Sequence, residues 1–275
     1  MSRLEAATFA TIVLAGAIFT FLERRFAYNP GQPVFRTGYW NDIVLYCFVQ
    51  SYVLGIVIGR LILFLDQHTR WSHLHLVSHW PILGQLGFFI VTHDLYIYLM
   101  HRLQHRWQPL WRFHEAHHSV PEVDWLSGVR SHSVEILINQ TVEFAPIVLL
   151  GAAPEVAVLK GAVSAIWGMF IHSNLNVRLG PVGYLINGPQ MHRWHHANEP
   201  EAYGKNFSTK LAIWDWLFGT AYLPDPTVSK ASVFGLGFKV PDQFPSGYFQ
   251  QHLLAFRRDM GPIETTPEET QSPVA

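Results

Sequence analysis

The sequence predicts an all-α protein, a multi-pass membrane helix bundle of about four to five spans. A helical cap on its cytoplasmic face is expected to carry the histidine-rich segments. Three observations lead to this fold class. Apolar residues make up 49% of the 275 residues and charged residues only 14%, against about 25% charged in an average soluble protein. Several apolar segments approach the roughly 17–25 residues that cross a bilayer as a helix. Ten of the sixteen histidines fall between His101 and His196.

Composition also excludes some partners and sites. The formal net charge is −1, so there is no electrostatic basis for binding nucleic acid. Cys47 is the only cysteine, which excludes an intramolecular disulfide and argues strongly against a cysteine-based metal site.

Five apolar segments are the candidate spans. The first could be a signal peptide with small residues at 15–17, but its apolar run continues to the charges at 23–25, which favours an anchor. The fourth is marginal because it contains Asn139, Glu143 and Pro146. In order, the segments are Ala6–Leu22, Ile43–Leu65, Ile82–Met100, Ile136–Leu150 and Glu155–Ile171.

Arginines orient these spans. They follow the first, third and fifth segments, at Arg24, Arg106 and Arg178 among others, and excess Lys and Arg marks the cytoplasmic side. With five spans the N-terminus is expected outside and the C-terminus inside the cell. The fourth and fifth spans would then return the chain to the face on which the third one ends.

One histidine pattern, H-x-x-H-H, occurs both before the fourth span and after the fifth, in "WRFHEAHHSV" and "MHRWHHANEP". Residues i, i+3 and i+4 share one side of a helix. One member of the adjacent pair can therefore join the first histidine on one metal, while the other reaches a neighbouring metal. The pair His101 and His105 adds a further i, i+4 chelate, and His172 stands at the end of the fifth span. The nine candidate ligands are His101, His105, His114, His117, His118, His172, His192, His195 and His196.

Nine imidazoles are too many for one tetrahedral zinc ion. Divided between two metals they give four or five each, which is normal for iron. His132 is left open between a ligand, a partner of a ligand and neither. Isolated histidines such as His73 and His252 are expected to be ordinary, and His93 a buried hydrogen-bonding residue. Asp94 lies two turns before His101 on one helix face, where it is expected to hydrogen-bond a ligand ring. Asp215 is expected to support the third histidine segment.

The run "HDLYIYLMHRLQHRWQPLWRFHEAHHS", then "IHSN", then "MHRWHHANEPEAYGKNFSTKLAIWDWLFGT" resembles the fatty acid hydroxylase superfamily. This family of integral-membrane diiron enzymes includes sterol desaturases, sphingolipid and fatty acid hydroxylases, and alkylglycerol monooxygenases. The resemblance covers about Asp94 to Thr220, nearly half of the chain, and all three histidine boxes appear in order. The nine histidines match family positions. Where some members have a further histidine this chain has Asn176, and Asn206-Phe207-Ser208 replaces the more usual N-Y-G.

The resemblance implies an O₂-dependent oxidoreductase that hydroxylates or desaturates a membrane lipid, with a fatty acyl, sterol-like or related chain. It further implies two Fe ions (Zn being possible as a substitute in purified protein) and O₂ as cosubstrate. An external electron donor such as a ferredoxin or a small haem protein is expected. The protein would be multi-pass in the membrane, the cell membrane if bacterial, with its active site on the cytoplasmic face.

Two other function classes remain open from the residues alone: a histidine-rich membrane metal transporter and a zinc-dependent lipid hydrolase. Transporter sites usually lie near the bilayer midplane, and a zinc hydrolase needs fewer ligands plus a general base. Metal content separates the three. We expect one integral-membrane domain over residues 1–260, with the histidine-box region at 94–220, and a disordered tail at 261–275.

Overall fold

The computed structural model describes residues 2–225, 231, 234 and 244–257, and over these residues the chain is helical, with only two isolated β-bridges. The expected tail at 261–275 lies outside the described residues. The α-helices are α1 Arg3–Arg25, α2 Tyr39–Asn41, α3 Ser51–Thr69, α4 Ile82–Arg106, α5 Gln108–His118, α6 Ser133–Leu149, α7 Pro154–His172, α8 Pro189–His195, α9 Ile213–Leu217 and α10 Tyr248–Leu254. A π-helix, η1, spans Asp42–Gln50, and short 3₁₀ helices lie at η2 Trp71–Leu74, η3 Ser127–Val129, η4 Gly180–Tyr184 and η5 Pro200–Ala202.

Four helices of the described part of the chain are long and apolar enough to cross a membrane. They are Arg3–Arg25, Tyr39–Thr69, Ile82–Arg106 and Pro154–His172. They contain the first, second, third and fifth predicted spans. Large apolar side chains on their outer sides are exposed, as a bilayer requires: Phe64 is 54% and Leu83 80% exposed. The protein is thus an integral membrane protein built as a helix bundle.

The predicted fourth span differs from the other four. It lies in α6, which has 17 residues and is therefore about 26 Å long, short of the roughly 30 Å of a hydrocarbon core. Glu143 is buried within it and Pro146 interrupts its hydrogen bonding. Among the residues that the structure describes, four helices therefore reach the length of a span and α6 does not. After α6 the chain turns at Gly151, whose φ of 71° suits glycine, and α7 leads back to His172.

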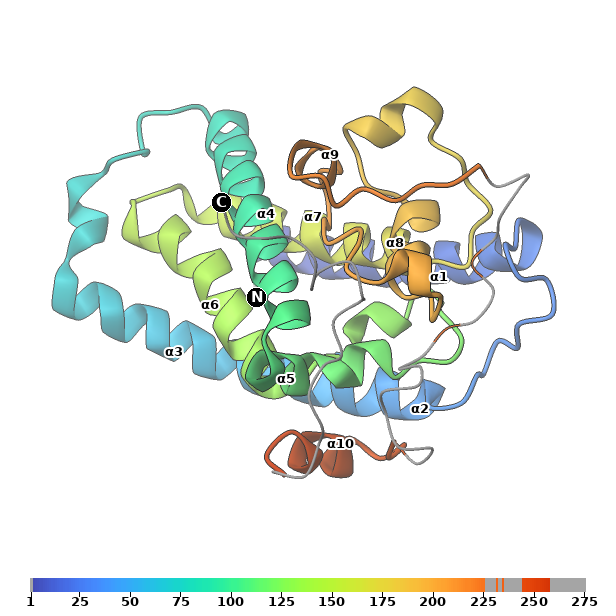
Figure 1. The fold of residues 1–275 in the computed structure, drawn as a ribbon. Helices are drawn as coiled ribbons and strands as arrows, with labels where there is room; N and C mark the ends of the chain where they lie inside the picture. The colour runs from blue at the N-terminus through green and yellow to red at the C-terminus, as the bar shows by residue number, and fades with distance from the viewer. Residues whose placement is uncertain (1, 226–230, 232–233, 235–243, 258–275) are drawn as a thin grey trace, which may run out of the picture.

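α4 packs against α6 and α7, and these two helices in turn pack against α3 and α1. α1 lies along α7, α3 lies along α6, and α4 contacts α5, α6 and α7 (Figure 1). One apolar cluster, Val77, Phe89, Ile147 and Val156, fills the end of the bundle near the α6–α7 turn. The short helices α5 and α8 sit at the other end of α4 and α7. The polar and histidine-bearing residues collect there.

A buried ionic network ties two loops together at this histidine-bearing end. The Arg36 guanidinium donates to both oxygens of Asp124 at 2.9 Å and also pairs with Asp42 at 2.7 Å. The Arg130 guanidinium donates to both Asp42 oxygens, at 2.7 and 2.9 Å. All four side chains are buried, so loss of one partner would leave an uncompensated charge, which typically costs about 3–5 kcal/mol. The network therefore fixes the backbone around Arg130.

Candidate metal centre

The fold brings all nine predicted histidines together in two groups. Within each group the candidate ligand nitrogens all lie within 4.8 Å of one another. The five-histidine group is His101, His105, His114, His118 and His195, and the four-histidine group is His117, His172, His192 and His196. All nine are buried except His105, which is partly buried.

The two H-x-x-H-H segments divide in opposite ways. In α5, His114 and His118 join the five-histidine group, while His117 joins the four-histidine group. At α8 the i, i+4 pair, His192 and His196, joins the four-histidine group, and His195 joins the other. Residues i and i+4 lie one above the other on a helix, while the middle histidine is rotated away. Each segment therefore reaches both groups, as the spacing predicts.

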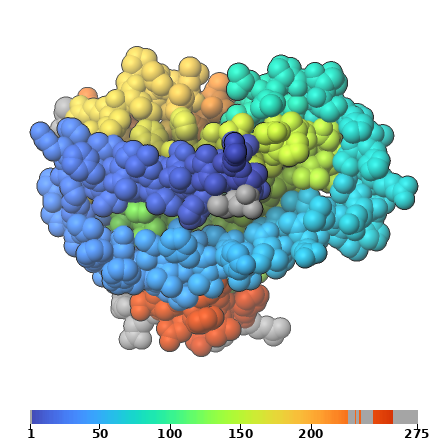
Figure 2. Space-filling model, turned by 180° about the vertical axis from the view of Figure 1, so that it is seen from behind, coloured from blue at the N-terminus to red at the C-terminus, as the bar shows by residue number. Residues whose placement is uncertain are grey.

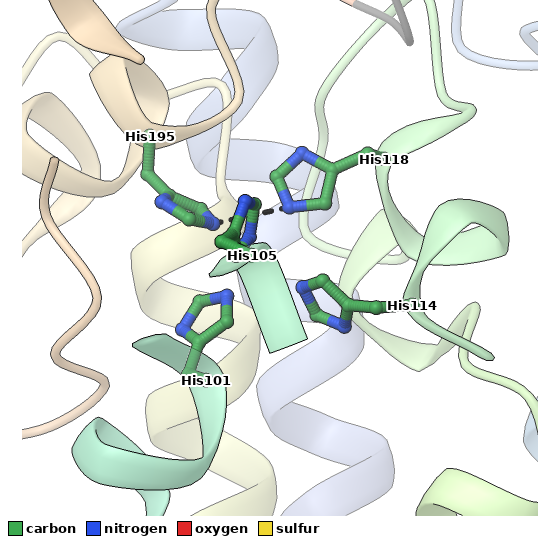
Figure 3. Close-up of side chains that lie close together, drawn as sticks. All are labelled: His101, His105, His114, His118 and His195. Atoms are coloured by element: carbon green, nitrogen blue, oxygen red, sulfur yellow. Dashed lines mark hydrogen bonds between the residues drawn. The ribbon is translucent and has the colours of Figure 1, made fainter. Parts of the chain in front are cut away.

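Three helices supply the five-histidine group: α4, α5 and α8 (Figure 3). Their rings surround one small volume and turn nitrogen atoms toward it. The second group adjoins the first. The rings of His118 and His196 are 4.5 Å apart, and those of His114 and His117 are 5.0 Å apart. Two ions a few ångströms apart, as in two-metal enzyme sites, fit this spacing.

On several of these rings Nδ1 donates a hydrogen bond to a backbone carbonyl, and this contact determines which ring nitrogen carries the proton. The Nδ1 atoms of His101, His117 and His195 lie 2.8, 3.1 and 2.9 Å from the carbonyl oxygens of Phe207, Arg130 and Lys205. His172 Nδ1 lies 2.8 Å from the Gly168 carbonyl in its own helix. A carbonyl can only accept, so in each case Nδ1 carries the proton and Nε2 is a bare lone pair in the neutral ring.

Several bare Nε2 atoms point at one another. His117 and His172 both carry their proton on Nδ1, yet their Nε2 atoms are 3.3 Å apart. Two lone pairs at this distance repel unless a cation lies near both. The buried Nε2 atoms of His101, His105 and His114 have no hydrogen-bond partner among the described residues, and a buried polar atom without a partner needs an explanation. A pair of metal ions would satisfy both sets, so the residues present fit such a group.

The protein environment also favours the neutral, ligating form. Burial lowers the pKa of His118 well below its usual value, and the neighbouring imidazoles of His196 and His195 lower it further. Burial and the adjacent His117 do the same to the pKa of His196. These rings are therefore neutral at neutral pH, with one nitrogen free of a proton, which is the state that binds metal.

The structure corrects the role expected for Asp94. Its carboxylate accepts from the backbone amides of Lys210 and Leu211 at 2.9 and 2.8 Å. It also accepts from Thr209 Oγ1 at 2.7 Å and Trp214 Nε1 at 3.1 Å. None of these donors is a histidine ring. The carboxylate is fully buried at its position on α4 and turns to the loop that follows α8, because that loop offers it unpaired backbone amides.

Asp94 still acts on the histidines through that loop. Asp215 accepts from the amides of Phe207 and Ser208 at 2.9 and 2.8 Å. The two aspartates thus fix residues 207–211 from both sides, and the Phe207 carbonyl in this loop orients His101. Asp215 was expected to support the third histidine segment, but the loop that it fixes orients His101 of the first segment.

Sequence reasoning missed two residues that touch the rings. The Glu135 carboxylate, at the start of α6, lies 2.9 Å from His114 Nδ1. It is the only carboxylate paired with one of the nine rings among the described residues. Gly128 lies against His172, where an added Cβ would come within 2.7 Å of Nδ1. An acidic residue three positions after His132 was the available signal for Glu135. No local pattern marked Gly128.

The remaining histidines lie apart from the two groups. His132 caps α6 by accepting from the Val134 amide at 3.1 Å, and its Nε2 donates to the His252 carbonyl. Its ring stacks on that of His252 at 4.4 Å. His93 is buried beside Lys160 and Glu143, between α4, α6 and α7, in keeping with the buried hydrogen-bonding role expected for it.

Known proteins share this region. The family model described as fatty acid hydroxylase matches residues 86–220, which include all nine histidines. The chain is 35% identical to ornithine lipid hydroxylase OlsE of Rhizobium tropici over 192 residues, covering 70% of this chain and 57% of that protein. It is 30% identical to alkylglycerol monooxygenase of Danio rerio, over 60% of this chain and 36% of that protein. It is 29% identical to methylsterol monooxygenase 1 of Rattus norvegicus, over 75% of this chain and 71% of that protein.

The first two of these matches span less than two thirds of the relatives' own lengths. No solved structure matches the chain. The region that the family model matches contains α4, α5, α6, α7 and α8, the helices that build and support the histidine centre. Through residues 86–220, this chain belongs to the fatty acid hydroxylase superfamily.

Proposed function

We propose that this protein is an O₂-dependent diiron oxidoreductase that hydroxylates a membrane lipid. The nine histidines are proposed to hold two metal ions, five rings on one and four on the other. The observation that carries the proposal is the set of bare, mutually facing Nε2 atoms in two adjoining buried groups. The relatives support an oxidoreductase acting on lipids, since their names are those of a lipid hydroxylase and monooxygenases.

The two iron ions, once reduced, would supply with O₂ the oxidant needed to break an unactivated C–H bond. The balanced reaction takes R–H, O₂, two electrons and two protons to R–OH and water. The chain's own residues hold the ring nitrogens in place through backbone carbonyls, and they bury the site so that water is excluded. We propose that a separate protein, a ferredoxin or a small haem protein, delivers the electrons on the cytoplasmic face.

Hydroxylation is favoured over desaturation because the three relatives named above are a hydroxylase and two monooxygenases. A metal transporter or a zinc hydrolase fits less well. The four ligands of a tetrahedral zinc site would leave five of the nine converging rings without a role. Rings held by hydrogen bonds to backbone carbonyls also suit a resident ion more than one in transit.

The test is to supply ¹⁸O₂ to cells with and without the gene and to analyse their lipids by mass spectrometry. Ornithine lipid is the first candidate substrate, because the relative that acts on it shares 35% identity. A gene-dependent lipid carrying one ¹⁸O is expected. His195→Ala should abolish it, whereas His73→Ala, at an exposed position of η2, should not. A new product that lacks the label and two hydrogens would show desaturation. Labelled product from the His195 variant with both metals retained would refute the site.

A further inference from the structure

Helix α10, Tyr248–Leu254, is amphipathic, but it turns its polar side to the protein and its apolar side outward, the reverse of a surface helix in a soluble protein. Its polar residues face the bundle. Gln251 is 3% exposed and accepts from the Tyr46 hydroxyl. Tyr248 donates to Gln50 at 2.7 Å. His252 Nε2 accepts from the Ser133 amide at 3.0 Å. These contacts attach α10 to η1 and to the start of α6.

Its apolar residues face outward. Phe249 is 71% exposed, Leu253 64% and Phe256, just beyond the helix, 64%. Their spacing of four and three residues places them on one side of the helix. In the space-filling view the segment forms a ridge (red-orange) beneath α2, η1 and α3 (Figure 2). Three large apolar side chains are thus turned away from the protein, as are the side chains by which a helix inserts into a membrane interface.

The position of α10 along the bundle agrees with that reading. The continuous helix Tyr39–Thr69 has 31 residues, about 46 Å, so about 16 Å of it extends beyond a hydrocarbon core of roughly 30 Å. Tyr46 and Gln50, which hold α10, lie toward its N-terminal end. Ser133, another contact, is the first residue of α6. α10 therefore lies where helices begin and end, at the boundary between lipid and water.

The helix that holds α10 also exposes apolar side chains near this contact. Phe48, Val49 and Tyr52 flank Gln50 on the same helix and are 55%, 49% and 73% exposed. On its other side, the segment reaches the metal centre's support, because the Phe256 ring packs 5.6 Å from that of Phe113, the residue before His114.

We propose that α10 is an interfacial membrane anchor. Phe249, Leu253 and Phe256 would insert into the leaflet on the side of the membrane where the nine histidines lie. The polar inner face would hold this lipid-covered helix against Ser133 and His132, at the start of α6. This inference does not depend on the reaction proposed above, and its test does not measure activity.

The experiment uses the full chain in lipid nanodiscs, with Cys47 replaced by Ser and one nitroxide-labelled cysteine at position 249, 253 or 256. Collision rates are measured with O₂, which concentrates in lipid, and with a water-soluble nickel chelate. Leu63, 53% exposed within α3, is the lipid-facing reference, and the exposed Glu201 is the aqueous reference. All three α10 positions should show an O₂-to-nickel ratio several-fold above that at 201 and below or equal to that at 63.

Two results would overturn the proposal. A ratio at all three positions equal to that at 201 would place the face in water. Low collision rates with both reagents would mean that protein covers it, and spin–spin broadening between labelled chains would identify a second copy. Phe256 also packs on Phe113, so folding of each variant is checked independently by size-exclusion chromatography and by metal content equal to that of the Cys47→Ser parent.

Discussion

Glu135 offers the sharpest test of how the protein tunes its proposed metal site. Its carboxylate lies 2.9 Å from His114 Nδ1 and is 6% exposed. A charged acceptor makes a hydrogen bond about twice as strong as a neutral one and makes the opposite ring nitrogen a better ligand. Outer partners of this kind typically change metal affinity about 10–100-fold. This range corresponds to about 1.4–2.7 kcal/mol.

Two substitutions separate the contribution of the Glu135 charge from that of its hydrogen bond to His114. Glu135→Gln keeps an acceptor for the Nδ1 proton and removes the charge, so we expect about tenfold faster loss of metal. Glu135→Ala also leaves a buried N–H unpaired, which adds about 1–3 kcal/mol, so its loss should approach a hundredfold. Purified protein in nanodiscs is mixed with a chromogenic iron chelator, and release is followed over time. Total metal per chain is measured by mass spectrometry. One ion per chain should be released faster than the other.

Glu143→Gln is the matched control. This second buried carboxylate of α6 pairs with Lys160 and Ser164 and touches none of the nine histidines. Its loss should lower the unfolding temperature, since it breaks a buried ion pair, without changing the release rate from folded protein. Wild-type release from Glu135→Ala, or equally fast release from Glu143→Gln, would refute the reasoning.

Three further predictions follow from the same contacts. Gly128→Ala should displace His172, because the new Cβ would lie 2.7 Å from its ring nitrogen; metal bound per chain should fall toward one, and two tightly held ions would contradict this. Asp94→Asn should loosen the loop that presents Phe207, so hydrogen exchange at 207–211 should accelerate and metal loss should rise; unchanged exchange would show that the carboxylate is dispensable. Burial lowers the pKa of His132 from 6.5 to about 4, so its contribution to stability is complete above pH 6.5 and is lost as the pH falls toward 4. His132→Asn, which can still cap α6, should therefore lose less thermal stability between pH 7 and pH 5 than wild type, and an equal loss would exclude this ring as a source of the pH dependence.

Local spacing was sufficient to predict much of this protein. The apolar segments gave four of the spans, because a helix that faces lipid must be apolar over a length fixed by the bilayer. The i, i+3, i+4 spacing predicted that each H-x-x-H-H segment serves two groups, because helix geometry alone fixes those directions. The sequence also named the nine histidines that gather in the two groups, and their role as metal ligands stays a prediction.

Tertiary structure decided what spacing could not. Asp94 shares a helix face with His101, but the carboxylate bonds the loop at 209–214, since unpaired backbone amides arrive there from more than a hundred residues away. Glu135 reaches His114 only because α6 packs beside α5. The marginal fourth segment lies in a short helix, whose Pro146 and buried Glu143 are accommodated inside the bundle. A sequence determines which way a side chain points from its own helix, whereas the partner that it meets depends on the packing of distant segments.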